Sequence, residues 1–340
     1  MKALLRLPLV LGFLLGLLLC GHARADSCSI TPANFAFPDV SSISTSDVFT
    51  SSSFQVTCTW ADFSLGNLLT PNVTVCLYLG AGTNSSTTVT APRTIGNGAL
   101  RVNYNIYTDA TYAAAKIWGG WAGTSTSSAA NAIIFTMTKT GGVGTISQNV
   151  SLFGKLNADA TLAAVAVGNT NLSFTSSFGA GSGLMQYIFF LTGTPSCALG
   201  PILPISFQVQ ANVINDCNIN IGNLVFPNSS ILNSAVRTTS SLSVQCSNST
   251  AYKIVFSAGT YGSSATARMM RNQANSDQVA YQISNVLDGT SLGDGTSGTV
   301  VLTGTGDGTS HSQTLYGLVP VQTTPSPGDY KDTITATVLF

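Results

Sequence analysis

Residues 203–217 read LPISFQVQANVINDC, and this stretch decides the fold. Apolar and polar side chains alternate along it, which is the pattern of a β-strand with one buried face. The expected buried face consists of Ile205, Phe207, Val209, Ala211 and Val213. The stretch lies between two halves of the chain that each have the pattern of a β-sandwich. We expect it to complete the first half, and no segment of this chain to complete the second.

The sequence of 340 residues opens with the features of an export signal. Lys2 and Arg6 give a positive start, and the apolar run at 7–19 is short for a membrane span. Ala23-Arg24-Ala25 fits a signal-peptidase site. We therefore expect a signal peptide at 1–25 and an exported product.

The composition of the remaining chain favours strands and turns. All 13 acidic residues are Asp, and Ser, Thr, Gly, Asn and β-branched residues dominate, which disfavours helix. Without Lys2, Arg6 and Arg24, 10 basic residues stand against 13 acidic ones. No basic patch indicates binding to nucleic acid.

The two halves are copies of one plan. Cys28-SITPANFAFPDV, ending in SFQVT-Cys58, matches Cys217-NINIGNLVFPNSS, ending in SLSVQ-Cys246. Six cysteines follow residue 25, and an even number in an exported chain favours disulfides, for which six cysteines allow 15 pairings. The repeat narrows these pairings to the following set, in which the third bridge follows by elimination: Cys28–Cys58, Cys217–Cys246 and Cys76–Cys197.

Further shared motifs resemble a known family. VSLFGKL at 150–156 matches TLYGLVP at 314–320, and the ending DYKDTITATVLF corresponds to LMQYIFFLTG at 184–193. Arg268 and Arg271 stand ahead of the strand pattern VAYQIS. Together with the cysteine-framed FPD and FPN segments, these features resemble spore coat U domains, the subunits of Csu-type archaic chaperone-usher pili. The resemblance is good over 217–340 and looser over 28–202.

The resemblance implies an all-β fold with two immunoglobulin-like, pilin-type β-sandwich domains in tandem, the second lacking its last strand. In this family a strand from a neighbouring subunit completes the open sandwich by β-strand addition. The implied acceptor cleft lies beside a strand with Ile334, Ala336, Val338 and Phe340. The implied division is a signal peptide at 1–25, an adhesin domain at 26–202, a donor-like strand and link at 203–216, and a pilin domain at 217–340.

Two such domains in one chain, with the longer copy first, resemble the tip adhesin of these pili. Only Asp26 and Ser27 stand between the expected cleavage site and Cys28, so we expect this chain to accept a strand but not to donate one. The implied partners are a periplasmic pilus chaperone, an outer-membrane usher, an adjacent subunit that donates a strand, and an abiotic or host surface. The implied location is the pilus tip at the cell surface, with a role in attachment and biofilm formation.

We expect the adhesive surface at the pole of the first domain that is remote from the second. Three connections should meet there, at 61–72, 108–130 and 193–201. Large apolar side chains in loops that are usually polar indicate a contact surface. The candidates are Phe63, Leu65, Leu68, Leu69, Ile117, Trp118 and Trp121. Glycines flank Trp118 and Trp121, which favours exposure. We expect Trp60 to be buried and the short apolar run at 162–167 to form a buried strand.

Two alternatives remain from the sequence: a carbohydrate-binding, lectin-type tip, and a non-adhesive structural coat or pilus subunit. His311 is the single histidine after residue 25, and no glycine-framed nucleophile accompanies it. Asp288, Asp294 and Asp307 each precede glycine, as in hairpin turns, without the spacing of a calcium loop. We expect no enzymatic activity, no cofactor and no metal site.

Overall fold

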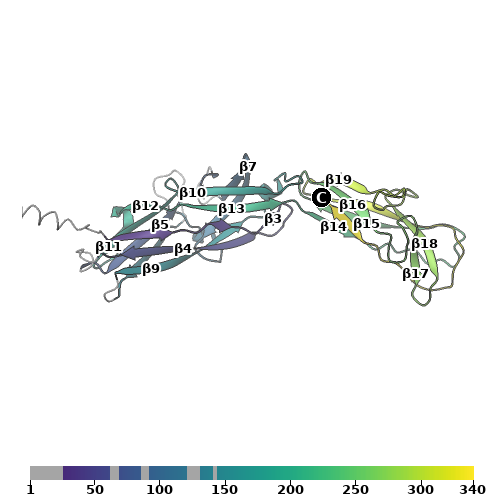
Figure 1. Ribbon diagram of the computed structural model, residues 1–340, viewed down its shortest axis with the longest axis horizontal. Helices are drawn as coiled ribbons and strands as arrows, with labels where there is room; N and C mark the ends of the chain where they lie inside the picture. Colours follow the sequence, from purple (N-terminus) through teal and green to yellow (C-terminus); the bar gives the residue numbers. More distant parts are fainter. Residues whose placement is uncertain (1–25, 62–68, 86–91, 121–130, 141–143) are drawn as a thin grey trace, which may run out of the picture.

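The computed structural model describes residues 26–61, 69–85, 92–120, 131–140 and 144–340. They form two β-sandwiches that lie end to end (Figure 1). The expected all-β class with tandem pilin-type domains is confirmed. No helix among the described residues is long and apolar enough to cross a membrane.

The first sandwich packs a nine-stranded sheet against a four-stranded sheet. The larger sheet contains, in spatial order, β1 (Ser27–Thr31), β4 (Val48–Thr59), β9 (Thr145–Leu156), β7 (Leu100–Tyr107), β6 (Arg93–Asn97), β10 (Leu172–Phe178), β13 (Phe207–Ile214) and β2 (Phe35–Ala36), with β3 (Val40–Ser41) also paired to β13. The smaller sheet contains β12 (Ile202–Pro204), β11 (Gly183–Phe190), β5 (Asn72–Leu79) and β8 (Ile133–Thr138). The connections between the described strands include the short helices η1 (Ala114–Lys116), α3 (Ala160–Ala163) and η2 (Cys197–Leu199).

The second sandwich has a six-stranded and a three-stranded sheet. The six-stranded sheet contains β14 (Cys217–Ile221), β15 (Val236–Cys246), β20 (Ser310–Val319), β18 (Gln278–Ser284), β17 (Arg268–Asn272) and β21 (Tyr330–Lys331). The three-stranded sheet contains β19 (Leu302–Thr305), β16 (Ala251–Phe256) and β22 (Ala336–Leu339). The spatial order matches that of the first sandwich from β1 to β10, so the repeat seen in the sequence is also a repeat of topology.

Each sandwich has its own hydrophobic core, because side chains alternate between a buried and an exposed face along the long strands. Hydrogen bonds join the two domains where they meet. The Gly168 N–H donates to the Asn248 carbonyl (3.2 Å), and the Thr250 hydroxyl donates to the Gly168 carbonyl (2.7 Å).

The three disulfides have the pairing that the repeat and elimination predicted. Cys28–Cys58 and Cys217–Cys246 join adjacent antiparallel strands at equivalent positions, with Cα separations of 4.0 and 4.1 Å. Cys76–Cys197 joins β5 to η2 and has no counterpart in the second domain.

The glycine of the LFG and LYG motifs has a packing role in both domains. A Cβ on Gly154 would lie 3.0 Å from the Phe37 ring, and one on Gly317 would lie 2.9 Å from the Phe226 ring. Both contacts are closer than ordinary van der Waals packing, so a glycine lets the aromatic ring lie on the sheet. Phe37 and Phe226 therefore occupy equivalent positions, one before each FP proline.

Candidate functional site

Leu203 and Pro204 of the alternating stretch belong to β12 of the four-stranded sheet, and residues 207–214 form β13, which belongs to the first domain. It pairs antiparallel with β10 over seven residue pairs, and parallel with β2 and β3 on its other side. The predicted inward side chains are all buried: Ile205, Phe207, Val209, Ala211 and Val213. Burial of such a row stabilises the domain by on the order of 10 kcal/mol, as an upper value.

Phe207 lies at the centre of an aromatic cluster. Its ring stacks on Phe178 at a centroid distance of 4.6 Å and on Trp118 at 6.2 Å. Phe54 meets it edge-on at 5.0 Å, and Phe35 lies 5.9 Å away. These rings come from four strands of the nine-stranded sheet and from the connection before β8, so the Phe207 side chain packs strands of that sheet and this connection into one core.

The second domain has the flanking elements of such a strand without the strand. Residues 222–235, which correspond to β2 and β3, have no strand structure, and β21 pairs with β17 alone. We call the side chains at this place the second-domain seam. It consists of Leu224, Phe226, Tyr330, Asp332 and Ile334.

Side chains of the second-domain seam are more exposed than the equivalent side chains beside β13 in the first domain. Phe35 and Phe37 are 0% and 6% exposed beside β13, whereas Leu224 and Phe226 are only half-buried. The residues expected beside an acceptor cleft are also incompletely covered, since Ile334, Ala336 and Val338 are half-buried and Phe340 is exposed. The same fold therefore holds a filled strand position in one domain and an uncovered one in the other.

Each domain has a buried arginine near the strand position that β13 fills in the first domain and that is uncovered in the second. The Arg93 guanidinium donates to the carbonyls of Gly80 (2.8 Å) and Trp118 (2.6 Å) and to Asn105 Oδ1 (2.7 Å). Burial lowers the pKa of Arg93 to about 10. Sequence reasoning did not select this residue, although Arg268 of the recognised motif is its counterpart at the start of β17.

Arg268 is bound in the same manner. Its guanidinium donates to the carbonyls of Ser257 (2.6 Å), Leu292 (2.7 Å) and Ala265 (2.9 Å). Burial lowers its pKa. Arg268 of the motif therefore has a structural role, because its guanidinium holds three backbone carbonyls together by hydrogen bonds.

The predicted adhesive residues fall into three groups. Phe63, Leu65, Leu68 and Trp121 lie outside the described residues. Leu69 is 54% exposed. The expectation of exposure is wrong for two others, since both are buried: Ile117 and Trp118.

Trp118 is a core residue that corresponds to Leu292. The Trp118 N–H donates to the Ile106 carbonyl (2.9 Å), as the Leu292 N–H donates to that of Ile283 (2.8 Å). The indole N–H of Trp118 donates to the Leu77 carbonyl at 3.0 Å. An alignment of the two halves around these residues is the sequence signal that would have placed the indole inside.

The connection that holds Trp118 does not reach the remote pole in its described part, 108–120. β7 ends opposite Phe153, three residues before the end of β9, and the chain then crosses to the end of β5 at Gly120. Gly120 has φ +77°, and a Cβ there would lie 2.7 Å from the Ala132 nitrogen. This glycine permits the chain to cross closely between the sheets and does not indicate an exposed loop tip.

Two other expectations about burial are confirmed. Trp60 is buried, and its indole N–H donates to the Thr70 carbonyl at 2.7 Å. Within 162–167, Leu162, Val165 and Val167 are buried in the first core, but the run begins in α3 and has no strand structure, so the expectation of a strand is wrong.

The outer face of the four-stranded sheet carries exposed apolar residues that sequence reasoning missed. Ile134 of β8, Leu199 of η2 and Ile202 of β12 are 63%, 86% and 64% exposed. The segments that build this sheet and η2 contain no Asp, Glu, Lys, Arg or His: 63–92, 117–138 and 160–215. We call this surface the neutral face. The long charge-free segments are the signal that could have found it.

The Cys76–Cys197 bridge fixes η2 on the neutral face. Cys76 points outward from β5, and the bridge holds Cys197 over it with a Cα separation of 6.1 Å. A Cβ on Gly200 would overlap the Tyr187 carbonyl oxygen. The segment after η2 therefore lies directly on β11.

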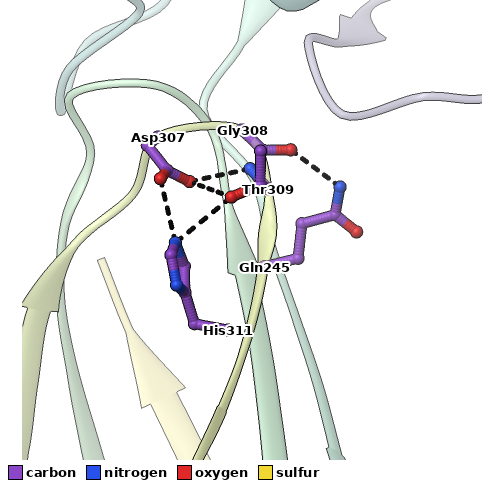
Figure 2. Close-up of polar contacts among 5 residues, drawn as sticks. All are labelled: Gln245, Asp307, Gly308, Thr309 and His311. Atoms are coloured by element: carbon purple, nitrogen blue, oxygen red, sulfur yellow. Dashed lines mark hydrogen bonds and ion pairs between the residues drawn. The ribbon is translucent and has the colours of Figure 1, made fainter.

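His311 lies in an exposed polar cluster with Asp307 and Thr309 (Figure 2). His311 Nε2 lies 2.9 Å from Asp307 Oδ2 and 3.2 Å from Thr309 Oγ1. In a catalytic triad the two ring nitrogens face different partners, whereas here one nitrogen faces both. Gly308 has φ +84°, but β19 and β20 on either side pair with different strands, so this Asp-Gly pair is not in a hairpin turn.

The described residues contain no group of three His, Cys, Asp or Glu that could hold a metal ion.

The fold and the seam define the class: a tandem pilin-type β-sandwich protein in which a strand of the chain completes one domain and the other remains uncovered. The family model described as Spore Coat Protein U domain matches residues 15–169 and 204–337. The chain belongs to the spore coat U family.

One solved structure with a similar fold is the "CsuC-CsuE chaperone-tip adhesion subunit pre-assembly complex from archaic chaperone-usher Csu pili of Acinetobacter baumannii". The TM-score is 0.54 at 16% sequence identity, and the match covers 92% of this chain and 100% of that chain. At this identity the likeness concerns the fold. A comparison with curated protein sequences found no match.

Proposed function

We propose that this chain is the tip adhesin subunit of an archaic chaperone-usher pilus. In this proposal an adjacent subunit donates a strand to the second domain, and apolar residues of the first domain attach the pilus to a surface. The observation that carries the proposal is the contrast between the two domains: β13 covers Phe35 and Phe37, while their counterparts Leu224 and Phe226 are half-buried. The fold similarity to a structure with a tip adhesion subunit supports the same assignment.

The partners follow from the uncovered seam. Unpaired strand edges beside half-buried apolar side chains promote aggregation, so the second domain needs a periplasmic chaperone before assembly. An outer-membrane usher then exchanges the chaperone for the strand of the adjacent subunit. The first domain accepts no partner strand because β13 already pairs with β10, β2 and β3. That asymmetry supports a position of the first domain at the free end of the pilus, on the cell surface.

Attachment by apolar contact is supported by the neutral face. Its sheet includes β11 and β12, which lie toward the end of the first domain that is remote from the second (Figure 1). Leu69 and Leu191, 54% and 56% exposed, precede β5 and follow β11 at that end. A surface without charged side chains loses little hydration when it contacts plastic or another apolar material. Attachment of this kind promotes biofilm formation.

The test replaces exposed apolar residues in the bacterium that makes the pilus. The double variant Leu199→Ser and Ile202→Ser should leave pilus number unchanged and reduce biofilm on polystyrene at least fivefold. A matched control is Val286→Ser with Leu287→Ser, because both residues are similarly exposed in the second domain. Unchanged attachment by the first variant, or equal loss in the control, would contradict apolar attachment. Inhibition of attachment by one free sugar would favour a lectin tip.

A further inference from the structure

We propose that Asp332 selects the strand that completes the second domain. The selected strand carries a hydrogen-bond-donating side chain opposite Asp332, at the position where β13 has Val209. This inference rests on the proposed function, because it assumes that a neighbouring subunit supplies a strand to the second-domain seam. It adds the chemistry by which the seam distinguishes one strand from another.

The two domains place Ser176 and Asp332 at equivalent positions. β10 pairs with the fourth residue of β6 through Thr175, and β21 pairs with the fourth residue of β17 through Lys331. The next residue in the chain is Ser176 of β10 in the first domain and Asp332, directly after β21, in the second. The register therefore aligns the two side chains.

A glycine turn confirms the alignment independently. Gly82 and Gly259 have φ +83° and +86°, and each follows the strand that precedes the buried arginine. A Cβ on Gly82 would lie 2.6 Å from Ser176 Oγ. A Cβ on Gly259 would overlap the Asp332 carboxylate. Both side chains thus lie against the same turn.

A strand seated as β13 is seated would cover Asp332. In the first domain Ser176 pairs with Val209 and is fully buried. In the second domain Asp332 lies on the inward side of its strand, with Ile334 two residues later, and is half-buried. Completion of the domain would therefore remove the water that now reaches this carboxylate.

The carboxylate has partners for part of its hydrogen-bonding capacity. It accepts hydrogen bonds from the Tyr281 hydroxyl (2.6 Å), the Thr260 N–H (2.8 Å) and the Thr333 N–H (2.8 Å). A carboxylate has about four acceptor sites, so about one remains for the incoming strand. The guanidinium of Arg268 donates to backbone carbonyls and makes no ion pair with Asp332.

An apolar side chain above Asp332 would leave this acceptor site without water or a donor. A buried charged group that lacks a partner destabilises a complex more than a neutral one does. Ser176 carries no charge, which is why valine is accepted opposite it. A threonine, asparagine or lysine side chain opposite Asp332 would supply the missing hydrogen bond.

The neighbouring positions complete the description of the partner strand. Phe207 lies opposite Phe178, whose counterpart is Ile334, and Ala211 lies opposite Phe174, whose counterpart is Tyr330. The expected strand therefore has a large apolar residue, then the hydrogen-bond donor two residues later, then a small residue after two more. Side chains between them face outward, as in β13.

The test uses peptides copied from residues 205–215 and the full chain refolded in their presence. Fluorescence polarisation of labelled peptides gives the dissociation constants. The peptide with Val209→Thr should bind about tenfold more tightly than the unchanged peptide. The control peptide with Gln210→Thr should differ less than threefold, because Gln210 faces outward.

Two variants of the chain assign the preference to Asp332. Asp332→Ser recreates the first-domain position and should abolish the preference for the Val209→Thr peptide. Asp332→Asn keeps the side-chain shape and should reduce the preference. This variant keeps the test decisive if the serine variant fails to fold. If all peptides bind the native chain equally, or if Asp332→Ser leaves the preference intact, the selection by Asp332 is refuted while strand acceptance stands. If no peptide binds, strand acceptance and the proposed function fail with it.

Discussion

Replacement of Phe207 by alanine is the sharpest test of the contribution of β13 to the first domain. The Phe207 side chain is 4% exposed and contacts the rings of Phe178, Phe54 and Trp118. Truncation of a buried phenylalanine lowers the free energy of unfolding by roughly 3 to 5 kcal/mol, because transfer free energy is lost and a cavity remains. With these ring contacts removed, we expect a loss of about 4 kcal/mol.

The assay is urea unfolding of the full, disulfide-intact chain, followed by tryptophan fluorescence. All three tryptophans, Trp60, Trp118 and Trp121, belong to the first half of the chain, so the signal reports on that domain. At a denaturant dependence of about 2.5 kcal/mol per molar urea, the midpoint should fall by about 1.6 M.

The control is Gln208→Ala, because Gln208 lies on the same strand and faces solvent. It should change the free energy of unfolding by about 0.5 kcal/mol or less. A loss below about 1 kcal/mol for Phe207→Ala, or equal losses for both variants, would refute the reasoning. The core of the first domain would then not depend on the strand.

Two further predictions concern a disulfide and a turn. Replacement of Cys76 and Cys197 by serine opens a loop of 121 residues, which by loop-closure entropy costs about 5 kcal/mol; urea unfolding measures it, and an unchanged midpoint would contradict it. Hydrogen bonds from Thr309 lower the pKa of Asp307 to about 2, so the stabilisation is present above the ordinary carboxyl range and lost as pH falls toward 2. Carbon-13 NMR should show this, Thr309→Val should raise the pKa, and ordinary titration of native Asp307 would refute it.

Much of the architecture could be predicted because its signals are local or repeated. The alternation at 203–217 has the two-residue period of a strand, and that period follows from backbone geometry. The duplicated cysteine segments identified Cys28–Cys58 and Cys217–Cys246 without knowledge of the fold. Trp60 was placed correctly because it stands two residues beyond Cys58, which is buried, and directly after the end of β4.

The adhesive residues were harder to predict, and Trp118 shows why. Glycines beside an aromatic residue are equally compatible with an exposed turn and with a close crossing through a core. The choice depends on neighbours distant in sequence, such as Phe207 and Leu77. The neutral face was missed for the related reason that Ile134 and Ile202 are brought to one surface only by pairing with β5 and β11.

The sequence by itself determined that the chain is built of strands, that its two halves share one plan, and which cysteines pair. These features can be predicted because they follow from the periods and spacings of residues along the chain. Only the tertiary structure decided that β13 lies between β10 and β2, that Trp118 is buried, and that Asp332 stands where Ser176 stands. The physical reason is that register and burial are set by side chains packing across pairs of strands, and those partners are remote from one another in the sequence.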